Sequence, residues 1–304
     1  MVLASLFPVV ALIILGNLLK HYQLTNETFL RTADRLVYYI FFPAMLFWKI
    51  GSSSPAETPL NARMFIGTLV ILGVLYLLSL VLIRFTAITD FQAGSFSQSC
   101  YRFNTYIGMA VVLNALGDDG VRAFGLLVGG MIPLINVLAV TTLIWFSGER
   151  IDALRKARLT LKALVANPLI IACLAGLGYS RLLGWFPPFI DNTLALFAMV
   201  TLPLALLSIG AALSLNSVRG HFGNALKAAV CKLGVGPLLG YLLLPLLNVS
   251  VLEYKVVMIY LTLPTSTAIY VLSAQLNSDT ELASAAIVLS TILAVAPLTW
   301  VLSL

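Results

Sequence analysis

Two long apolar segments of this chain are interrupted by polar residues near their middles. The first interruption falls at Asn104 and Thr105, and the second falls 160 positions later at Pro264, Thr265 and Ser266. Inside a membrane, freed backbone groups are tolerated only where they line a cavity or are buried in protein. The start of each half-helix presents unpaired N–H groups and partial positive charge. The pattern therefore predicts a cage of donors that fits a carboxylate better than a cation.

Each residue of this cage has a structural alternative. Asn104 is placed to cap the second half of its helix, but it could also make a hydrogen bond between helices without touching a substrate. Pro264 suits the first turn of its half-helix. Thr265 and Ser266 offer hydroxyls to a substrate or, equally, to the carbonyls that the break frees.

Three further polar residues lie inside apolar runs. A charge at the depth of Lys232 costs about 3 kcal/mol even on forgiving insertion scales, which favours a functional lysine over one that snorkels. Arg102 either balances substrate charge or anchors loop carbonyls, and these alternatives stay open. For Asn136, lining the cavity and a structural role are equally supported.

The composition indicates an integral membrane protein. The chain has 304 residues, of which 60% are hydrophobic and 10% charged, with a mean hydropathy of +1.01. A soluble domain has roughly 25% charged residues. Cys100, Cys173 and Cys231 lie in apolar runs without CxxC spacing, which indicates free core cysteines. No HExxH motif and no paired carboxylates occur within the predicted spans, so no metal, cofactor or enzymatic centre is expected.

Apolar runs predict ten spans of about 20 residues. They lie at 2–20, 28–50, 63–85, 95–116, 120–147, 165–184, 189–215, 222–247, 252–276 and 280–303. On one side of the membrane the span ends carry ten basic residues: Lys20, Arg31, Arg84, Arg150, Arg155, Lys156, Arg158, Lys162, Arg219 and Lys227. On the other side they carry five: Lys49, Arg63, Arg122, Arg181 and Lys255. The richer side is predicted to be cytoplasmic. Both termini then lie on the non-cytoplasmic side of the cell membrane, and the linker 148–164 is a cytoplasmic topology anchor or, alternatively, a lipid-headgroup site.

The halves 1–147 and 165–304 repeat each other at an offset of 160 positions. The matches include Pro8 with Pro168, Gly16 with Gly176, Pro43 with Pro203, Thr105 with Thr265 and Asp119 with Asp279. Because each half has an odd number of spans, the second half enters the membrane from the opposite side. The expected fold is thus all-α, with ten transmembrane helices in a five-plus-five inverted repeat, an architecture of secondary transporters.

Three stretches carry a resemblance to a known family. They are YRFNTYIGMAVVLNALGDDG at 101–120, TLPLALLSIGAAL at 201–213 and LTLPTSTAIYVLSAQLNSDTELASAAIVLSTIL at 261–293. They resemble the auxin efflux carrier family in its prokaryotic form, over the whole chain. The resemblance implies a bile-acid-symporter-like fold. In that fold helices 1, 2, 6 and 7 form a scaffold, helices 3–5 and 8–10 form a transport domain, and helices 4 and 9 cross where they break.

The expected function is that of a secondary carrier for a small organic anion, and the outward direction comes from the resemblance alone. An organic-anion importer coupled to sodium or protons is the alternative. An intramembrane enzyme is a remote third, because it would need paired acids or a metal set. Expected partners are the anion and membrane lipids, with no nucleic acid, and a homodimer is left open.

Overall fold

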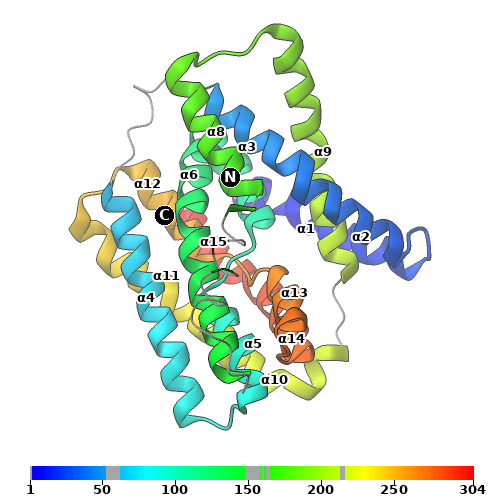
Figure 1. The fold of residues 1–304 in the computed structure, drawn as a ribbon, viewed down its shortest axis with the longest axis vertical. Helices are drawn as coiled ribbons and strands as arrows, with labels where there is room; N and C mark the ends of the chain where they lie inside the picture. Colours follow the sequence, from blue (N-terminus) through cyan, green and yellow to red (C-terminus); the bar gives the residue numbers. More distant parts are fainter. Residues whose placement is uncertain are drawn as a thin grey trace. The chain divides into compact units, whose positions relative to one another are not determined.

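The computed structural model describes residues 2–52, 62–147, 158, 161, 165–166, 168–212 and 216–304. Every regular element in these residues is helical (Figure 1). Apart from residues 158 and 161, the predicted linker 148–164 lies outside the described residues. Five helical stretches of the described chain are long and apolar enough to cross a membrane, at Ala62–Phe85, Asp90–Phe146, Pro188–Ala211, Val218–Leu247 and Thr280–Ser303. Two shorter apolar helices lie at Leu6–His21 and Pro168–Leu182.

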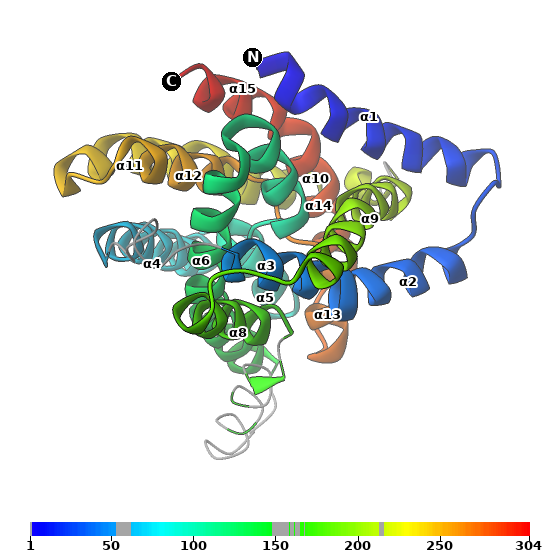
Figure 2. The same ribbon diagram turned by 90° about the horizontal axis from the view of Figure 1, so that it is seen from above.

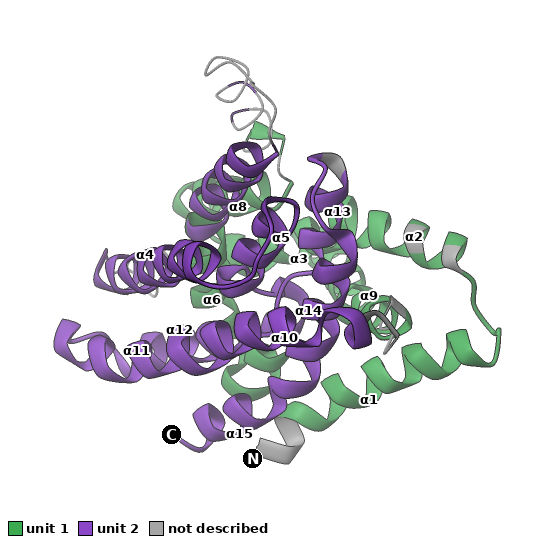
Figure 3. Ribbon diagram, turned by 90° about the horizontal axis from the view of Figure 1, so that it is seen from below, with its two compact units in different colours: residues 1–61, 109–130, 165–212 green, residues 62–108, 131–164, 213–304 purple. Residues whose placement is uncertain are grey.

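The chain divides into two compact units, each of which draws on both halves of the sequence (Figure 3). Unit 1 comprises residues 1–61, 109–130 and 165–212. Its helices are α1 (Val2–His21), α2 (Glu27–Leu36), α3 (Phe42–Gly51), α8 (Pro168–Leu182), α9 (Pro188–Ala212) and part of α6 (Thr105–Phe146). Within it α1 packs on α9, and α3 packs on α8 and α9.

Two glycines allow α1 and α9 to touch backbone to backbone. A Cβ atom added to Gly16 would lie 2.1 Å from the carbonyl oxygen of Leu207. One added to Gly210 would lie 1.9 Å from the carbonyl oxygen of Ile13. No side chain fits at either position, so the close crossing depends on glycine.

Unit 2 comprises residues 62–108, 131–164 and 213–304. Its helices are α4 (Ala62–Phe85), α5 (Asp90–Tyr101), both ends of α6, α10 (Asn216–Val230), α11 (Gly236–Leu243), α12 (Val251–Thr262), α13 (Ala268–Gln275), α14 (Thr280–Leu293) and α15 (Val295–Ser303). Within it α10 packs on α14, α12 packs on α11 and α15, and α5 contacts α4, α10, α13 and α14 (Figure 2). The side chains of α5 from Ala93 to Tyr101 are all buried, so α5 is the central helix of this unit.

Side-chain caps set several helix starts. Thr89 accepts from the N–H of Gln92 at the start of α5, and Asp279 accepts from two N–H groups at the start of α14. Ser250 and Glu253 form a reciprocal capping box at the start of α12. Each cap satisfies backbone donors that the first turn of a helix leaves without a partner.

Two prolines widen the helices that contain them. The π-helical turn η1 (Val37–Phe41) directly precedes α3 with Pro43, and η2 (Cys231–Val235) directly precedes α11 with Pro237. A proline cannot donate to the carbonyl four residues earlier, and its ring clashes with that carbonyl. The chain relieves the clash by adding one wider turn, so the predicted spans 28–50 and 222–247 continue through their prolines. The 3₁₀ turn η3 (Leu244–Leu247) then ends the latter span.

The helices follow the predicted spans with two differences. Spans 95–116 and 120–147 are not separated by a loop: they meet inside α6 at a kink, where Gly117 takes φ 63° and ψ −156°. Only a residue without Cβ enters that region easily. The helices of spans 95–116 and 222–247 begin earlier than predicted, at Asp90 and Asn216, because their first turns are polar and give no apolar signal.

Candidate functional site

The two predicted helix breaks are present in unit 2, and they contact each other. The helix α5 ends at Tyr101, and α6 begins at Thr105. The helix α12 ends at Thr262, and α13 begins at Ala268. The backbone N–H of Asn104 donates to the carbonyl of Pro264 across 2.9 Å. Segments 160 residues apart in the sequence are therefore joined at their broken backbone.

Asn104 caps α6, as predicted. Its Oδ1 accepts from the N–H groups of Tyr106 and Ile107, each at 3.1 Å. The side chain is 2% exposed. Its Nδ2 has no hydrogen-bond partner among the described residues. One end of this amide is thus committed to the helix, and the other is a buried donor without an acceptor, a condition that native structures usually resolve with water, an ion or a ligand.

The second break differs from the prediction. Pro264 does not lie in the first turn of a helix, because α13 begins only at Ala268. The intervening residues bond elsewhere: the N–H of Thr265 donates to Ser290 Oγ at 3.0 Å, and its hydroxyl donates to the carbonyl of Ser99 at 2.9 Å. The Ser266 hydroxyl accepts from the N–H of Ala268 at 3.3 Å. These bonds hold the segment in place without a helical turn, so only α6 starts directly at the break.

Arg102 occupies the first break and is held by two amides. It is 8% exposed. Its Nη1 donates to Gln98 Oε1 at 3.3 Å, and its Nη2 donates to Asn136 Oδ1 at 3.1 Å. The structure thus brings the predicted residues Arg102 and Asn136 together. Gln98 was missed, although its position four residues before Arg102 on one helix face was a usable signal.

Lys232 is fully buried on the π-helical turn η2. Its Nζ lies 5.8 Å from the ring centroid of Tyr260, whose ring lies 4.1 Å from that of Phe103 in the first break. Neither Lys232 Nζ nor the Tyr260 hydroxyl has a hydrogen-bond partner within the part of the chain that the structure describes. Tyr260 was missed because an aromatic residue in an apolar run is usually core.

The site is therefore rich in donors. Asn104 and Lys232 both bury donors that find no acceptor in the described part of the chain. The ion pairs that the structure describes are formed elsewhere, by Lys49 with Asp118 and by Arg122 with Asp119, and the Asp279 carboxylate lies 3.2 Å from His221 Nε2. This balance suits a ligand that brings negative charge and acceptor oxygens.

Residues 1–302 match the model of a protein family described as "Membrane transport protein". A protein of Methanocaldococcus jannaschii, named as an uncharacterized transporter, is 24% identical over 304 residues, covering 97% of this chain and 96% of the relative. A protein of Rhizobium meliloti, named "Putative malonate transporter", is 24% identical over 277 residues, covering 89% of this chain and 85% of the relative.

Proposed function

Because the chain belongs to this membrane transport family of the auxin efflux carrier type, we propose that it moves a small organic anion across the cell membrane. The family and its relatives indicate a multi-pass membrane transporter and not an enzyme. The proposal names the substrate as a carboxylate and the transport as secondary, by alternating access, with efflux as the direction.

One observation carries this proposal: the buried donor of Asn104 at the start of α6, which has no acceptor among the residues that the structure describes. A carboxylate there would accept from Nδ2 and lie at a helix N-terminus, which favours negative charge. Lys232 would supply a compensating charge. Arg102 would add positive charge to the site, held by its hydrogen bond to Asn136. The walls of the site would be formed by Thr105, Pro264, Thr265 and Ser266. The malonate in the name of the Rhizobium meliloti relative makes that dicarboxylate the first compound to test.

The packing of unit 1 supports an inverted repeat of ten spans. At the offset of 160, α1 corresponds to α8, and α3 corresponds to part of α9. The pair α1–α9 therefore maps onto the pair α8–α3. In each pair, the two helices contact each other. A two-fold relation between the repeats 1–147 and 165–304 would produce this exchange of partners.

The division into units supports an elevator-like mechanism. Unit 1 gathers the predicted scaffold spans, and unit 2 gathers most of the predicted transport spans together with both breaks. Residues 109–130 fall in unit 1 although the resemblance assigned them to the transport domain. In the proposed cycle unit 2 carries the anion, the linker 148–164 is cytoplasmic and both termini lie outside.

Transport by the purified protein in liposomes tests the function. Labelled malonate, monocarboxylates, an aromatic carboxylate and an organic cation would be offered, with and without pH and sodium gradients. We expect carboxylate exchange that unlabelled carboxylate inhibits and the cation does not. Uptake that requires a sodium gradient would favour the importer alternative. Cation flux without carboxylate flux would refute the proposal.

A further inference from the structure

A histidine and a buried carboxylate meet in unit 2, where α10 and α14 begin. His221 Nε2 lies 3.2 Å from Asp279 Oδ2, and the two side chains are 19% and 8% exposed. His221 Nδ1 is shielded from solvent and has no hydrogen-bond partner within the described chain. Histidine is the side chain that ordinarily changes charge between about pH 5 and pH 8. A contact of this kind therefore responds to pH.

Asp279 holds the starts of three helices together. Its Oδ1 accepts from the N–H groups of Glu281 and Leu282 at 3.0 and 2.8 Å and so caps α14. Its own N–H donates to the carbonyl of Phe91, in the first turn of α5, at 3.0 Å. The other carboxylate oxygen, Oδ2, faces His221 of α10. The strength with which α10 joins the other two helices at this point therefore depends on the charge of the imidazole.

Both α10 and α14 lead from this contact to the broken backbone. Lys232 follows His221 by 11 positions, and Ser290 follows Asp279 by 11 positions, which is about 16 Å along either helix. The Ser290 hydroxyl accepts from the N–H of Thr265 in the second break, and α10 packs on α14 (Figure 3). The polar contact at the helix starts therefore helps to fix the register of α10, and with it the level of Lys232.

Few other charges lie near the contact. The other ionised groups on α10 and on the helices α5 and α14 that pack on it are Asp90, Glu281, Arg219 and Lys227. The first three are exposed, and the ammonium group of the fourth donates to Asn224 Oδ1 at 3.1 Å. In the part of the chain that the structure describes, His221 thus has one acidic partner, the buried Asp279.

The corresponding carboxylate of the first repeat has a different partner. Asp119 matches Asp279 at the offset of 160 positions. It is 68% exposed and pairs with Arg122 of its own helix. A guanidinium group stays charged at every physiological pH, so this pair does not respond to pH as a histidine pair does. In an inverted repeat the two carboxylates lie at opposite faces of the membrane, and the pH-responsive contact is then on one face only.

We propose that His221 and Asp279 form a proton-binding site that controls carboxylate flux through the register of α10. With the proton bound, an imidazolium faces the carboxylate, and a charge-assisted hydrogen bond is roughly twice as strong as a neutral one. Without the proton the contact weakens, and the fraction of the protein with Lys232 in place falls. The imidazole takes the proton from water and returns it to water, and no other bond forms or breaks. His221 is a positioning residue, and the inference rests on the proposed carboxylate transport.

Malonate counterflow by the purified full-length chain in liposomes, with equal pH on both sides, tests this proposal between pH 5 and pH 8. The titration of malonate itself is common to all variants, so each rate is divided by the rate of His221→Gln at the same pH. We expect the ratio for the unmodified protein to fall about fivefold as the pH rises. His221→Lys should restore flux with a ratio that stays high, because lysine keeps its charge over this range. A ratio that does not change with pH, or a His221→Lys protein as slow as His221→Gln, would overturn the proposal.

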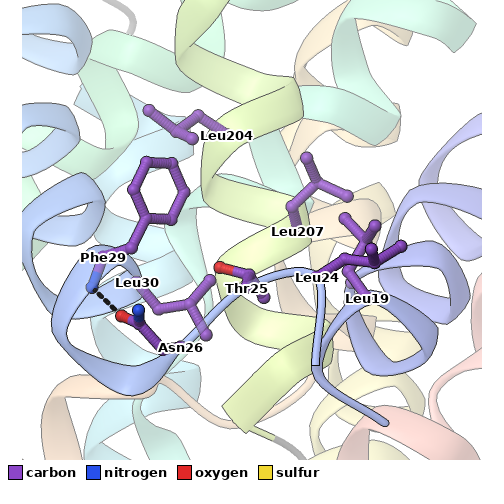
Figure 4. Close-up of a pocket in the computed structure, with 9 residues that line it drawn as sticks. Leu19, Leu24, Thr25, Asn26, Phe29, Leu30, Leu204 and Leu207 are labelled. Carbon is purple, nitrogen blue, oxygen red and sulfur yellow. Dashed lines mark hydrogen bonds between the residues drawn. The ribbon is translucent and has the colours of Figure 1, made fainter. Parts of the chain in front are cut away.

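The second of the two histidines in the chain provides the matched control. His21 is exposed at the end of α1 in unit 1. It lies in the chain between Leu19 and Leu24, which line a pocket of about 330 Å³ whose described lining carries no charged side chain (Figure 4). His21→Gln should therefore keep the pH profile of the unmodified protein. Loss of the profile in both histidine variants would contradict a site specific to His221.

Thermal unfolding in detergent distinguishes a failure of this inference from a failure of the transport proposal. Asp279→Asn keeps a residue that caps α14 and removes the charge that faces His221. A double-mutant cycle of Asp279→Asn with His221→Gln should give a coupling at pH 5 that is about halved at pH 8. Equal coupling at both pH values, or none at either, would overturn the proton site even if carboxylate flux is normal. A pH-dependent coupling in a protein that moves no carboxylate would support the proton site and refute the transport function.

Discussion

Asn104→Asp removes the donor that the proposed site depends on and keeps a side chain that can cap the helix. Aspartate and asparagine cap helices about equally well, so the bonds to Tyr106 and Ile107 can persist. What changes is Nδ2, which becomes an oxygen that cannot donate, and the side chain gains a negative charge that repels a carboxylate. The variant therefore removes the anion-binding group while keeping the helix start, whereas Asn104→Ala removes both.

The magnitudes separate the two effects. A hydrogen bond to a charged partner contributes about 1.5–3 kcal/mol net, which corresponds to a loss of affinity from roughly tenfold to somewhat above a hundredfold. The lost cap in Asn104→Ala costs about 1 kcal/mol of stability in addition. We therefore expect both variants to lose carboxylate affinity, the aspartate variant more because of its charge, and the alanine variant also to lose stability through its cap.

Both variants would be measured for carboxylate counterflow in liposomes and for thermal unfolding in detergent. Asn114→Ala is the matched control, because Asn114 is exposed on the same helix and its Nδ2 donates to the carbonyl of Ala110 at 2.8 Å. Counterflow of unchanged affinity in a stably folded Asn104→Asp protein would refute the reasoning, since the amide would then be only a cap.

Three other predictions concern charge, positioning and topology. Lys232→Gln should abolish or strongly slow carboxylate flux, and Lys232→Arg should restore it only in part because a planar guanidinium is not a point charge; unchanged binding and flux in Lys232→Gln would mean that the lysine is structural. Gln98→Leu removes one of the two amide acceptors of Arg102 and should slow flux less than Asn104→Asp does, whereas an equal loss would place Gln98 itself at the substrate. A cysteine placed near residue 155 should resist an impermeant thiol reagent in intact cells, and its labelling would contradict a cytoplasmic linker.

Local patterns in the sequence predicted most helix boundaries and both breaks. Apolar runs end where polar or turn-forming residues begin, and these signals lie within a few positions of the boundary they set. The break at Asn104 was visible for the same reason: a capping residue stood inside an apolar run. The late start of α13 was not visible, because it depends on bonds from Thr265 to Ser99 and Ser290, residues 166 and 25 positions away.

The same distinction applies to the site residues. Lys232 and Arg102 could be selected because a charge inside a predicted span is costly wherever it points. Their surroundings could not be predicted, since Asn136 lies 34 positions from Arg102, and Tyr260 meets Lys232 only through the packing of α12 against η2. Proline marked both π-helical turns, but a proline equally predicts a kink or a helix end.

The placement of Lys232 gives a physical reason to expect an anion. Burying its charge costs about 3 kcal/mol. The Tyr260 ring, at 5.8 Å, lies near the limit of the cation–π range, where the gain is about 1 kcal/mol. A carboxylate about 4 Å away would gain about 4 kcal/mol at an effective dielectric constant near 20. Desolvation of the carboxylate offsets part of this gain, so the pairing lowers the cost of burying a charged lysine and favours an anion over a cation at this place.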